Sequence, residues 1–133
     1  MKAALERLTR STFRSKQRLS RSDAAEARQR GRATIRRHAE EMLRDRLAPA
    51  TPVNDGRQTP FRGHAVFTAQ HATATCCRSC LVKWHGIEKG RAMNDDEIAY
   101  ATAVVMAWID RQMDSQWEAP DSSSLPLFDD TDS

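Results

Sequence analysis

Three cysteines, Cys76, Cys77 and Cys80, lie within five residues of one another, and the chain has no other cysteine. Cysteines this close together cannot join distant parts of a fold, and an odd number leaves one without a disulfide partner. We therefore expect no disulfide framework of the kind that holds small secreted proteins together. The chain must fold around a hydrophobic core, and the roles that remain for the cysteines are metal binding and redox chemistry.

The cysteines form half of a zinc site with a nearby histidine. Cys77, Cys80 and His85 have the spacing of the first three ligands of a zinc knuckle, with two and then four residues between them. Zinc binds thiolate sulfur at about 2.3 Å and imidazole nitrogen at about 2.0 Å in such sites. The fourth knuckle position is Gly90, which cannot bind the ion through a side chain. The fourth ligand must therefore come from elsewhere.

His71, Cys76 and His64, in that order, are the candidates for the fourth ligand. If water fills the position instead, the site is open and could be catalytic. An iron–sulfur cluster held by the three cysteines and a histidine ranks below zinc, because adjacent cysteines rarely bind one cluster. The cysteines could also be small buried core residues, or Cys76 could be a nucleophile with His64 or His71 as its base.

Composition suits one small domain. The chain has 133 residues, of which 39% are hydrophobic and 29% charged, enough for a single modest core. It has no run of 18 apolar residues, so we expect no transmembrane helix. The amino-terminal segment lacks the apolar stretch of a secretory signal, and we expect a cytoplasmic location.

Apolar spacing and capping residues predict a mainly α fold: a small, single-domain helical structure with a Cys/His metal-binding turn between helices. A helix is expected from a cap at Ser22 or Asp23 to Leu47, interrupted at Gly31. Residues 48–63 are a loop, residues 64–75 are ambiguous but favour helix, and residues 80–85 form a short helix. Asn94 and Glu97 begin the last helix as a capping box, and it continues to about residue 116. Residues 1–20 are a basic arm, 21–117 the domain, and 118–133 an acidic disordered tail.

Charge is unevenly distributed. Residues 1–47 carry 14 Lys/Arg and 6 Asp/Glu, whereas residues 94–133 carry 1 and 10. A basic front indicates a surface that faces a polyanion, and nucleic acid is the partner that we expect. The alternative is that the two ends merely solvate the protein or pair with each other. The predicted phosphate contacts are Arg14, Arg18, Arg32, Arg36, Arg37, Arg78 and Lys83.

The acidic tail contains a short apolar motif. Ser124-Leu125-Pro126-Leu127-Phe128 is similar to the pentapeptide with which bacterial replication and repair proteins dock on the sliding clamp, although Ser124 replaces the usual Gln. Apolar anchors in a flexible tail can fill preformed pockets on a partner. Leu125, Leu127 and Phe128 are therefore predicted to contact the clamp.

Several stretches of the chain together match a known family pattern. They are Phe13-Arg14-Ser15, Gly31 with Thr34-Ile35 and His38-Ala39, Arg46 to Ala50, Asn54 to Pro60, Arg62-Gly63-His64, Gln70 to Arg78, Cys80-Leu81, Lys83-Trp84-His85, Lys89-Gly90 and Trp108-Ile109. With these residues the chain resembles an uncharacterised, mainly bacterial family known as domain of unknown function 4186. The resemblance covers roughly residues 9–113 and departs from the family at Ala65, where Pro is usual. It implies that the basic arm belongs to the domain and that the acidic tail lies outside it, but it implies no activity.

The leading hypothesis from the sequence is a zinc-binding, nucleic-acid-associated accessory protein that the tail recruits to the clamp. The alternatives are a small metalloenzyme with a Cys/His metal centre and a structural zinc domain that binds another protein. The sequence contains no phosphate-binding Gly-rich loop and no His-Glu-x-x-His motif, and it leaves open whether any reaction is catalysed.

Overall fold

The computed structural model describes residues 12–52, 59–60 and 63–118, and no strand occurs among them. The helices are α2 (Thr12–Ser15), α3 (Arg21–Arg30), α4 (Arg32–Arg46), α5 (Ala65–Thr73), α6 (Arg78–His85) and α7 (Asp95–Met113), followed by the 3-10 turn η1 (Asp114–Glu118). The mainly helical fold is therefore confirmed, and the ambiguous segment 64–75 contains a helix.

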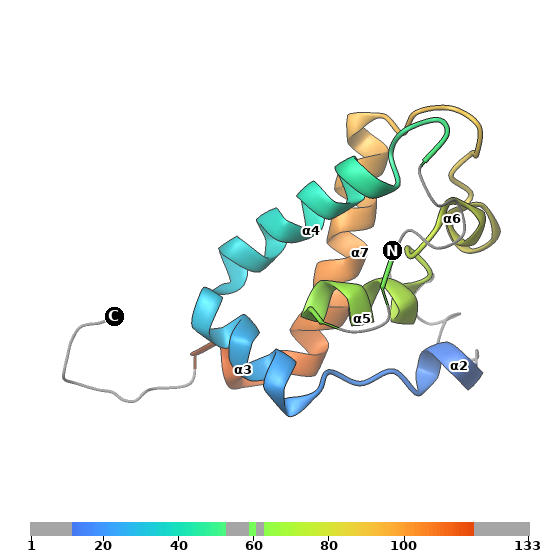
Figure 1. Ribbon diagram of the computed structural model, residues 1–133. Helices are drawn as coiled ribbons and strands as arrows, with labels where there is room; N and C mark the ends of the chain where they lie inside the picture. Colours follow the sequence, from blue (N-terminus) through green and yellow to red (C-terminus); the bar gives the residue numbers. More distant parts are fainter. Residues whose placement is uncertain (1–11, 53–58, 61–62, 119–133) are drawn as a thin grey trace.

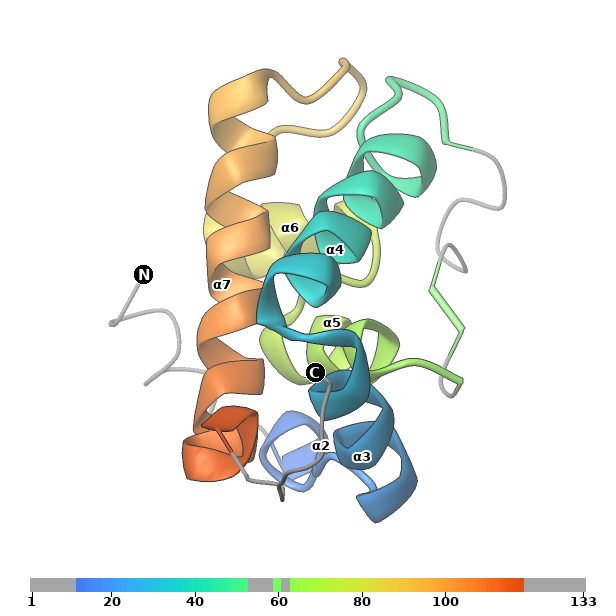
Figure 2. The same ribbon diagram turned by 90° about the vertical axis from the view of Figure 1, so that its left-hand side faces the viewer.

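The two longest helices, α4 and α7, pack side by side, and α5 packs against both (Figures 1 and 2). Helix α7 runs the length of the core, because its apolar side chains recur every three or four residues from Ile98 to Met113. One part of the core lies between α3, α4, α5 and α7, and includes Ile35 and Val66. A second part gathers Leu43, Leu81 and Ile98 near the carboxyl end of α4. No described helix is long and apolar enough to cross a membrane.

Local signals set most helix boundaries. Gly31, with φ 92°, separates α3 from α4 at the interruption that the sequence predicts. The cap of α3 is Ser20, whose hydroxyl accepts from the N–H of Asp23 at 3.0 Å, so the predicted caps Ser22 and Asp23 are wrong by two or three residues. Asn94 and Glu97 form the predicted capping box of α7. Gly86, with φ 71°, ends α6 as expected.

Candidate metal centre

The turn between α5 and α6 brings the cysteines together, and hydrogen bonds at the end of α5 set its shape. Ala74 has a left-handed backbone, with φ 61°, which ends the helix. The side-chain amide of Gln70 donates to the carbonyl of Thr75 at 3.0 Å, and the N–H of Thr75 donates to the carbonyl of Gln70 at 2.9 Å. The turn then delivers Cys76 and makes Cys77 the N-cap of α6.

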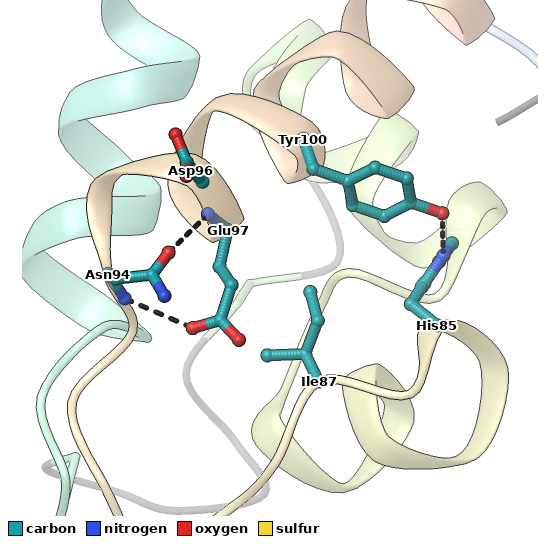
Figure 3. Close-up of a pocket in the computed structure, with 6 residues that line it drawn as sticks. All are labelled: His85, Ile87, Asn94, Asp96, Glu97 and Tyr100. Carbon is teal, nitrogen blue, oxygen red and sulfur yellow. Dashed lines mark hydrogen bonds between the residues drawn. The ribbon is translucent and has the colours of Figure 1, made fainter.

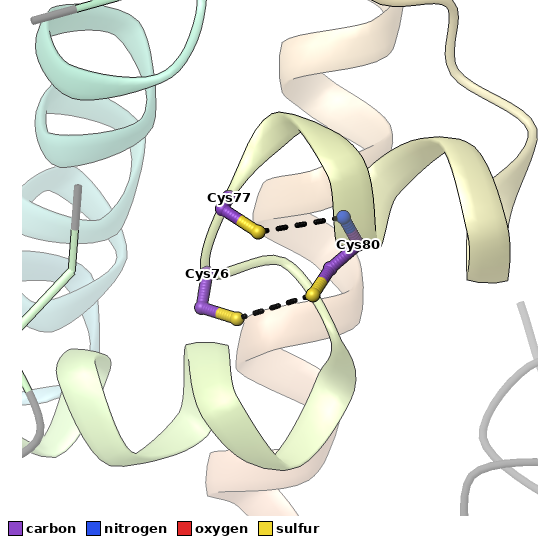
Figure 4. Close-up of side chains that lie close together, drawn as sticks. All are labelled: Cys76, Cys77 and Cys80. Carbon is purple, nitrogen blue, oxygen red and sulfur yellow. Dashed lines mark hydrogen bonds between the residues drawn. The ribbon is translucent and has the colours of Figure 1, made fainter. Parts of the chain in front are cut away.

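Cys76, Cys77 and Cys80 place their sulfur atoms within 4.8 Å of one another (Figure 4). The sulfurs of Cys76 and Cys80 are 3.6 Å apart. Sulfurs that bind one tetrahedral zinc ion at about 2.3 Å stand about 3.8 Å from each other, so the observed spacing suits a shared ion. Among the described residues, these three alone form a set of cysteine, histidine or acidic side chains compact enough to hold a metal. The chain therefore has a three-cysteine cluster that could bind a metal ion.

Hydrogen bonding makes the three thiols unequal. Sγ of Cys77 accepts from backbone N–H groups in the first turn of α6, including that of Cys80 at 3.4 Å, whereas the thiol of Cys76 donates to Sγ of Cys80. The neighbouring thiol of Cys76, then that of Cys80, and these backbone bonds lower the pKa of Cys77 far below that of an ordinary thiol. The pKa of Cys76 is raised in return, first by the neighbouring Cys77 and then by Cys80 and by burial. A thiolate at Cys77, which a metal requires, is therefore favoured by the fold.

Arg14, from α2, reaches the cluster across the fold. Its guanidinium donates to Sγ of Cys80 at 3.2 Å and to the carbonyl of His71, and it lies 5.7 Å from the centre of the Trp84 ring. A cation in this position stabilises negative charge on the sulfur that it contacts. The structure does not support the prediction that Arg14 contacts phosphates, because its guanidinium points inward to the cysteines.

His71 lies at the end of α5, close to the cysteines. Its Nε2 is 3.1 Å from the carbonyl oxygen of Thr59, and Thr59 also donates its hydroxyl to the carbonyl of Cys76 at 2.8 Å. Because a carbonyl can only accept, Nε2 carries a proton and Nδ1 is unprotonated in the neutral ring. The pKa of His71 is lowered, chiefly by burial, although the nearby Cys77 acts in the opposite sense. The neutral ring is the form that binds metals.

His85 is held by two hydrogen bonds outside the cysteine group. Its Nδ1 is 2.9 Å from the hydroxyl of Tyr100 in α7, and its Nε2 is 2.7 Å from the carbonyl of Thr73 in α5. Figure 3 shows the pair of rings on one side of a pocket of about 280 Å³, which Ile87 and Glu97 also line. His85 is not among the residues that the structure gathers as a metal group, although the sequence pattern places it there.

His64 caps α5 and lies beside another histidine. Its Nδ1 accepts from the N–H of Val66 at 3.0 Å, and its Nε2 is 3.2 Å from Nδ1 of His38 in α4. Neither histidine belongs to the cysteine group. In place of the expected half-site with a histidine, the structure thus brings together the thiols of Cys76, Cys77 and Cys80 and uses the histidines of α5 and α6 in the surrounding hydrogen bonds.

Arg78 is the largest completely buried side chain among the described residues. Its guanidinium donates to the carbonyls of Leu47, Ala48 and Pro49 after α4, at 3.0–3.3 Å, and to those of Glu88 and Arg91 before α7. The prediction that Arg78 contacts phosphates is therefore wrong, because the side chain is 0% exposed and holds two loops together. It also begins α6, directly after Cys77, and so fixes the helix that carries Cys80.

The other predicted phosphate contacts lie on the surface and have partners within the chain. Arg32 forms two hydrogen bonds of 2.9 Å with Asp110. Arg36 and Arg37 each lie 3.9 Å from a glutamate one turn further along α4. Arg18 donates to the carbonyls of Ser15 and Gln17, and Lys83 lies 5.7 Å from the Trp84 ring centre. The predicted clamp contacts Leu125, Leu127 and Phe128 lie outside the described residues.

The contacts of Arg14, Thr59, Gln70 and Tyr100 with this site were not predicted. Arg14 and Cys80 are 66 residues apart, and no local pattern indicates that they meet. Gln70 has a weak signal, since a buried polar residue in a helix of small apolar residues requires a nearby hydrogen-bond partner.

No solved structure matches the chain. The family described as domain of unknown function DUF4186 matches residues 2–110, which includes α2 and the whole cysteine cluster and ends near the end of α7. With most of its length matched, the chain belongs to the DUF4186 family.

Proposed function

We propose that the protein binds one zinc ion through Cys76, Cys77 and Cys80. The observation that carries the proposal is the approach of three sulfur atoms to within 4.8 Å on a single turn. Zinc is favoured over an iron–sulfur cluster because such clusters take four cysteines as a rule, and this chain has three. A tetrahedral site then needs one more ligand.

His71 is the best candidate for the fourth ligand. Metal-binding histidines almost always donate their second ring N–H to a carboxylate, a carbonyl or water, and His71 donates Nε2–H to the carbonyl of Thr59. The same bond sets the tautomer in which Nδ1 is the metal-binding atom. His85 and His64 are weaker candidates, because their ring nitrogens bond to groups away from the cysteines, whereas Cys77 is among the charges that act on His71. An external ligand, such as water, is the alternative, and it would leave an open site suited to catalysis.

Elemental analysis of the full chain, purified under reducing conditions, tests the proposal. One zinc per chain in the wild type, and loss of zinc in Cys77→Ser, is the expected result. Iron with sulfide would identify a cluster instead, and metal-free protein that takes up no added zinc would reject the proposal.

Substitution of Co²⁺ for zinc then identifies the fourth ligand, since its absorption bands report the number of thiolates and the geometry. His71→Ala should change the bands if His71 is bound. A change on addition of azide to the wild type would instead indicate exchangeable water.

Association with nucleic acid is a second proposal, and the surface of α4 supports it. Arg36 and Arg37 are 51% and 62% exposed, and their glutamate partners stand at 3.9 Å. Exposed ion pairs of this kind contribute little, about 0–1 kcal/mol, so a phosphate can replace the glutamate. Binding to labelled DNA or RNA should weaken steeply with salt, and the charge-reversed double variant Arg36→Glu, Arg37→Glu should abolish it. The absence of binding at low salt would reject this proposal.

Recruitment to the sliding clamp through the tail is a proposal that stands on the sequence motif alone. Leu127→Ala with Phe128→Ala should remove binding of the full chain to purified clamp, whereas Asp129→Asn with Asp130→Asn should leave it unchanged. If the wild type does not bind, the motif is a chance match.

A further inference from the structure

Hydrogen bonds near both ends of the amino-terminal segment 12–19 attach it to the domain. At its far end, the N–H of Leu19 donates to the side chain of Gln112 in α7 at 2.9 Å. At its near end, Arg14 donates to the sulfur of Cys80 and to the carbonyl of His71. Helix α2 is only four residues long and packs against α5. A single turn of helix is not stable in isolation, so its position depends on these contacts.

The contact of Arg14 with Cys80 depends on the charge of the cysteine cluster. A neutral thiol is a weak hydrogen-bond acceptor, whereas a thiolate is a strong one. Three thiolates around a divalent ion leave one net negative charge, and the guanidinium of Arg14 lies 3.2 Å from the sulfur of Cys80. Arg78 lies next to Cys77 in sequence, but its guanidinium is turned to the carbonyls of the two loops.

We infer that Arg14 is a positioning residue for the metal centre, and that metal binding by the three cysteines fixes the segment 12–17 onto the domain. The inference rests on the proposed zinc site. Segment 12–17 is thereby a metal-dependent cover of the cluster, in which Arg14 contacts Cys80, the carbonyl of His71 at the end of α5 and the ring of Trp84. The anchor at Leu19 involves no metal ligand, so residues 19–24 should remain fixed with or without metal.

Arg18 offers a matched control. It lies on the same segment, four residues after Arg14, and donates to the carbonyls of Ser15 and Gln17 within that segment. Arg14→Gln and Arg18→Gln therefore remove the same charge from the same arm, and only the first removes a contact with the cysteines.

Zinc affinity of the full chain, measured by competition with a chromogenic chelator, is the first readout. Arg14→Gln should weaken binding by about 10–100-fold, the usual effect of losing a group that supports a metal ligand. Arg14→Lys should give a smaller loss, because it keeps the charge but not the planar fork that reaches two acceptors. Arg18→Gln should bind like the wild type.

Hydrogen exchange of the wild-type arm, with zinc and with a chelator, is the second readout and needs no variant. Zinc should slow exchange at residues 12–17 and leave residues 19–24 unchanged. If the wild type binds no zinc, the proposed function fails. If it binds zinc but Arg14→Gln binds equally tightly and exchange in the arm does not depend on zinc, the zinc site stands and this inference is overturned.

Discussion

The hydroxyl of Tyr100 lies 2.9 Å from Nδ1 of His85, and Nε2 of the same ring lies 2.7 Å from the carbonyl of Thr73. The carbonyl can only accept, so Nε2 carries the proton and the hydroxyl donates to Nδ1. His85 thereby links α6 to α7 and to the end of α5. This structural role accounts for a histidine at position 85 without requiring that it bind a metal.

His85→Gln should therefore leave the zinc content unchanged while it destabilises the fold. Glutamine cannot make both hydrogen bonds in the same geometry, and we expect a loss of about 1–3 kcal/mol in the free energy of unfolding. Urea denaturation and elemental analysis of the same preparation measure both quantities. Tyr100→Phe, which removes one of the two bonds, should cost less. Loss of zinc from a folded His85→Gln variant would show instead that His85 is a metal ligand, as the knuckle spacing predicts.

Cys76→Ser should weaken zinc binding as strongly as Cys77→Ser or Cys80→Ser. The knuckle interpretation makes Cys76 an optional fourth ligand, whereas the structure places its sulfur 3.6 Å from that of Cys80. A chelator competition with each variant gives the comparison. Ser79→Ala changes the exposed neighbour in the same turn and keeps all three thiols, so it should bind zinc normally. Tight binding by Cys76→Ser would contradict the three-cysteine set.

Zinc should raise the thermal stability of the wild type, because an ion that binds only the folded chain stabilises it by mass action. The gain is about 2.7 kcal/mol when free zinc is 100 times its dissociation constant. Melting curves with zinc and with a chelator should therefore differ. The variant with all three cysteines replaced by serine should show no such difference, and a difference that persists there would place the ion elsewhere.

The helices could be predicted from the sequence because their signals are local. The capping box at Asn94 and Glu97, the glycine stop at Gly86 and the apolar stripe of α7 each lie within one helix. The turn that holds the cysteines was predictable for the same reason, since Cys-x-x-Cys places two thiols on one tight turn.

The surroundings of the cluster could not be predicted because they depend on contacts between distant segments. Arg14 and Arg78 belong to a chain rich in arginine, and sequence alone does not distinguish a buried guanidinium from a solvated one. One donates to Cys80 and the other to five backbone carbonyls. Whether a guanidinium is buried or solvated is therefore decided by packing and not by charge composition.

Arg78→Lys should destabilise the protein almost as much as Arg78→Gln. The guanidinium satisfies carbonyls of two separate loops, and an ammonium group cannot reach both sets from one position. Leaving buried carbonyls without a donor costs about 1–3 kcal/mol each, so a loss of about 3 kcal/mol or more is expected. Urea denaturation measures it. Arg28→Gln, at an exposed position of α3, should change stability little, and a stable Arg78→Lys variant would contradict this account.

The stability of the protein should fall as the pH drops below about 6.5, the usual pKa of histidine, and His64 should account for part of the fall. Burial lowers the pKa of His64, as does the charge of His38 beside it. The unfolded chain therefore takes up the proton first as the pH decreases, which favours unfolding. Protonation of Nδ1 also removes the acceptor for the N–H of Val66, a cap worth about 1 kcal/mol.

His64→Asn isolates this contribution, because asparagine keeps a cap acceptor and does not titrate. Other groups, including His71, also titrate, so the informative quantity is the difference between the two proteins. Free energies of unfolding, measured in urea with a chelator present, should decrease more for the wild type than for His64→Asn between about pH 7 and about pH 5. If the two proteins lose stability in parallel, protonation of His64 in the folded protein costs no free energy. In that case the acidic groups Glu26 and Asp23, which raise the pKa of His64, offset the effects of burial and of the charge of His38.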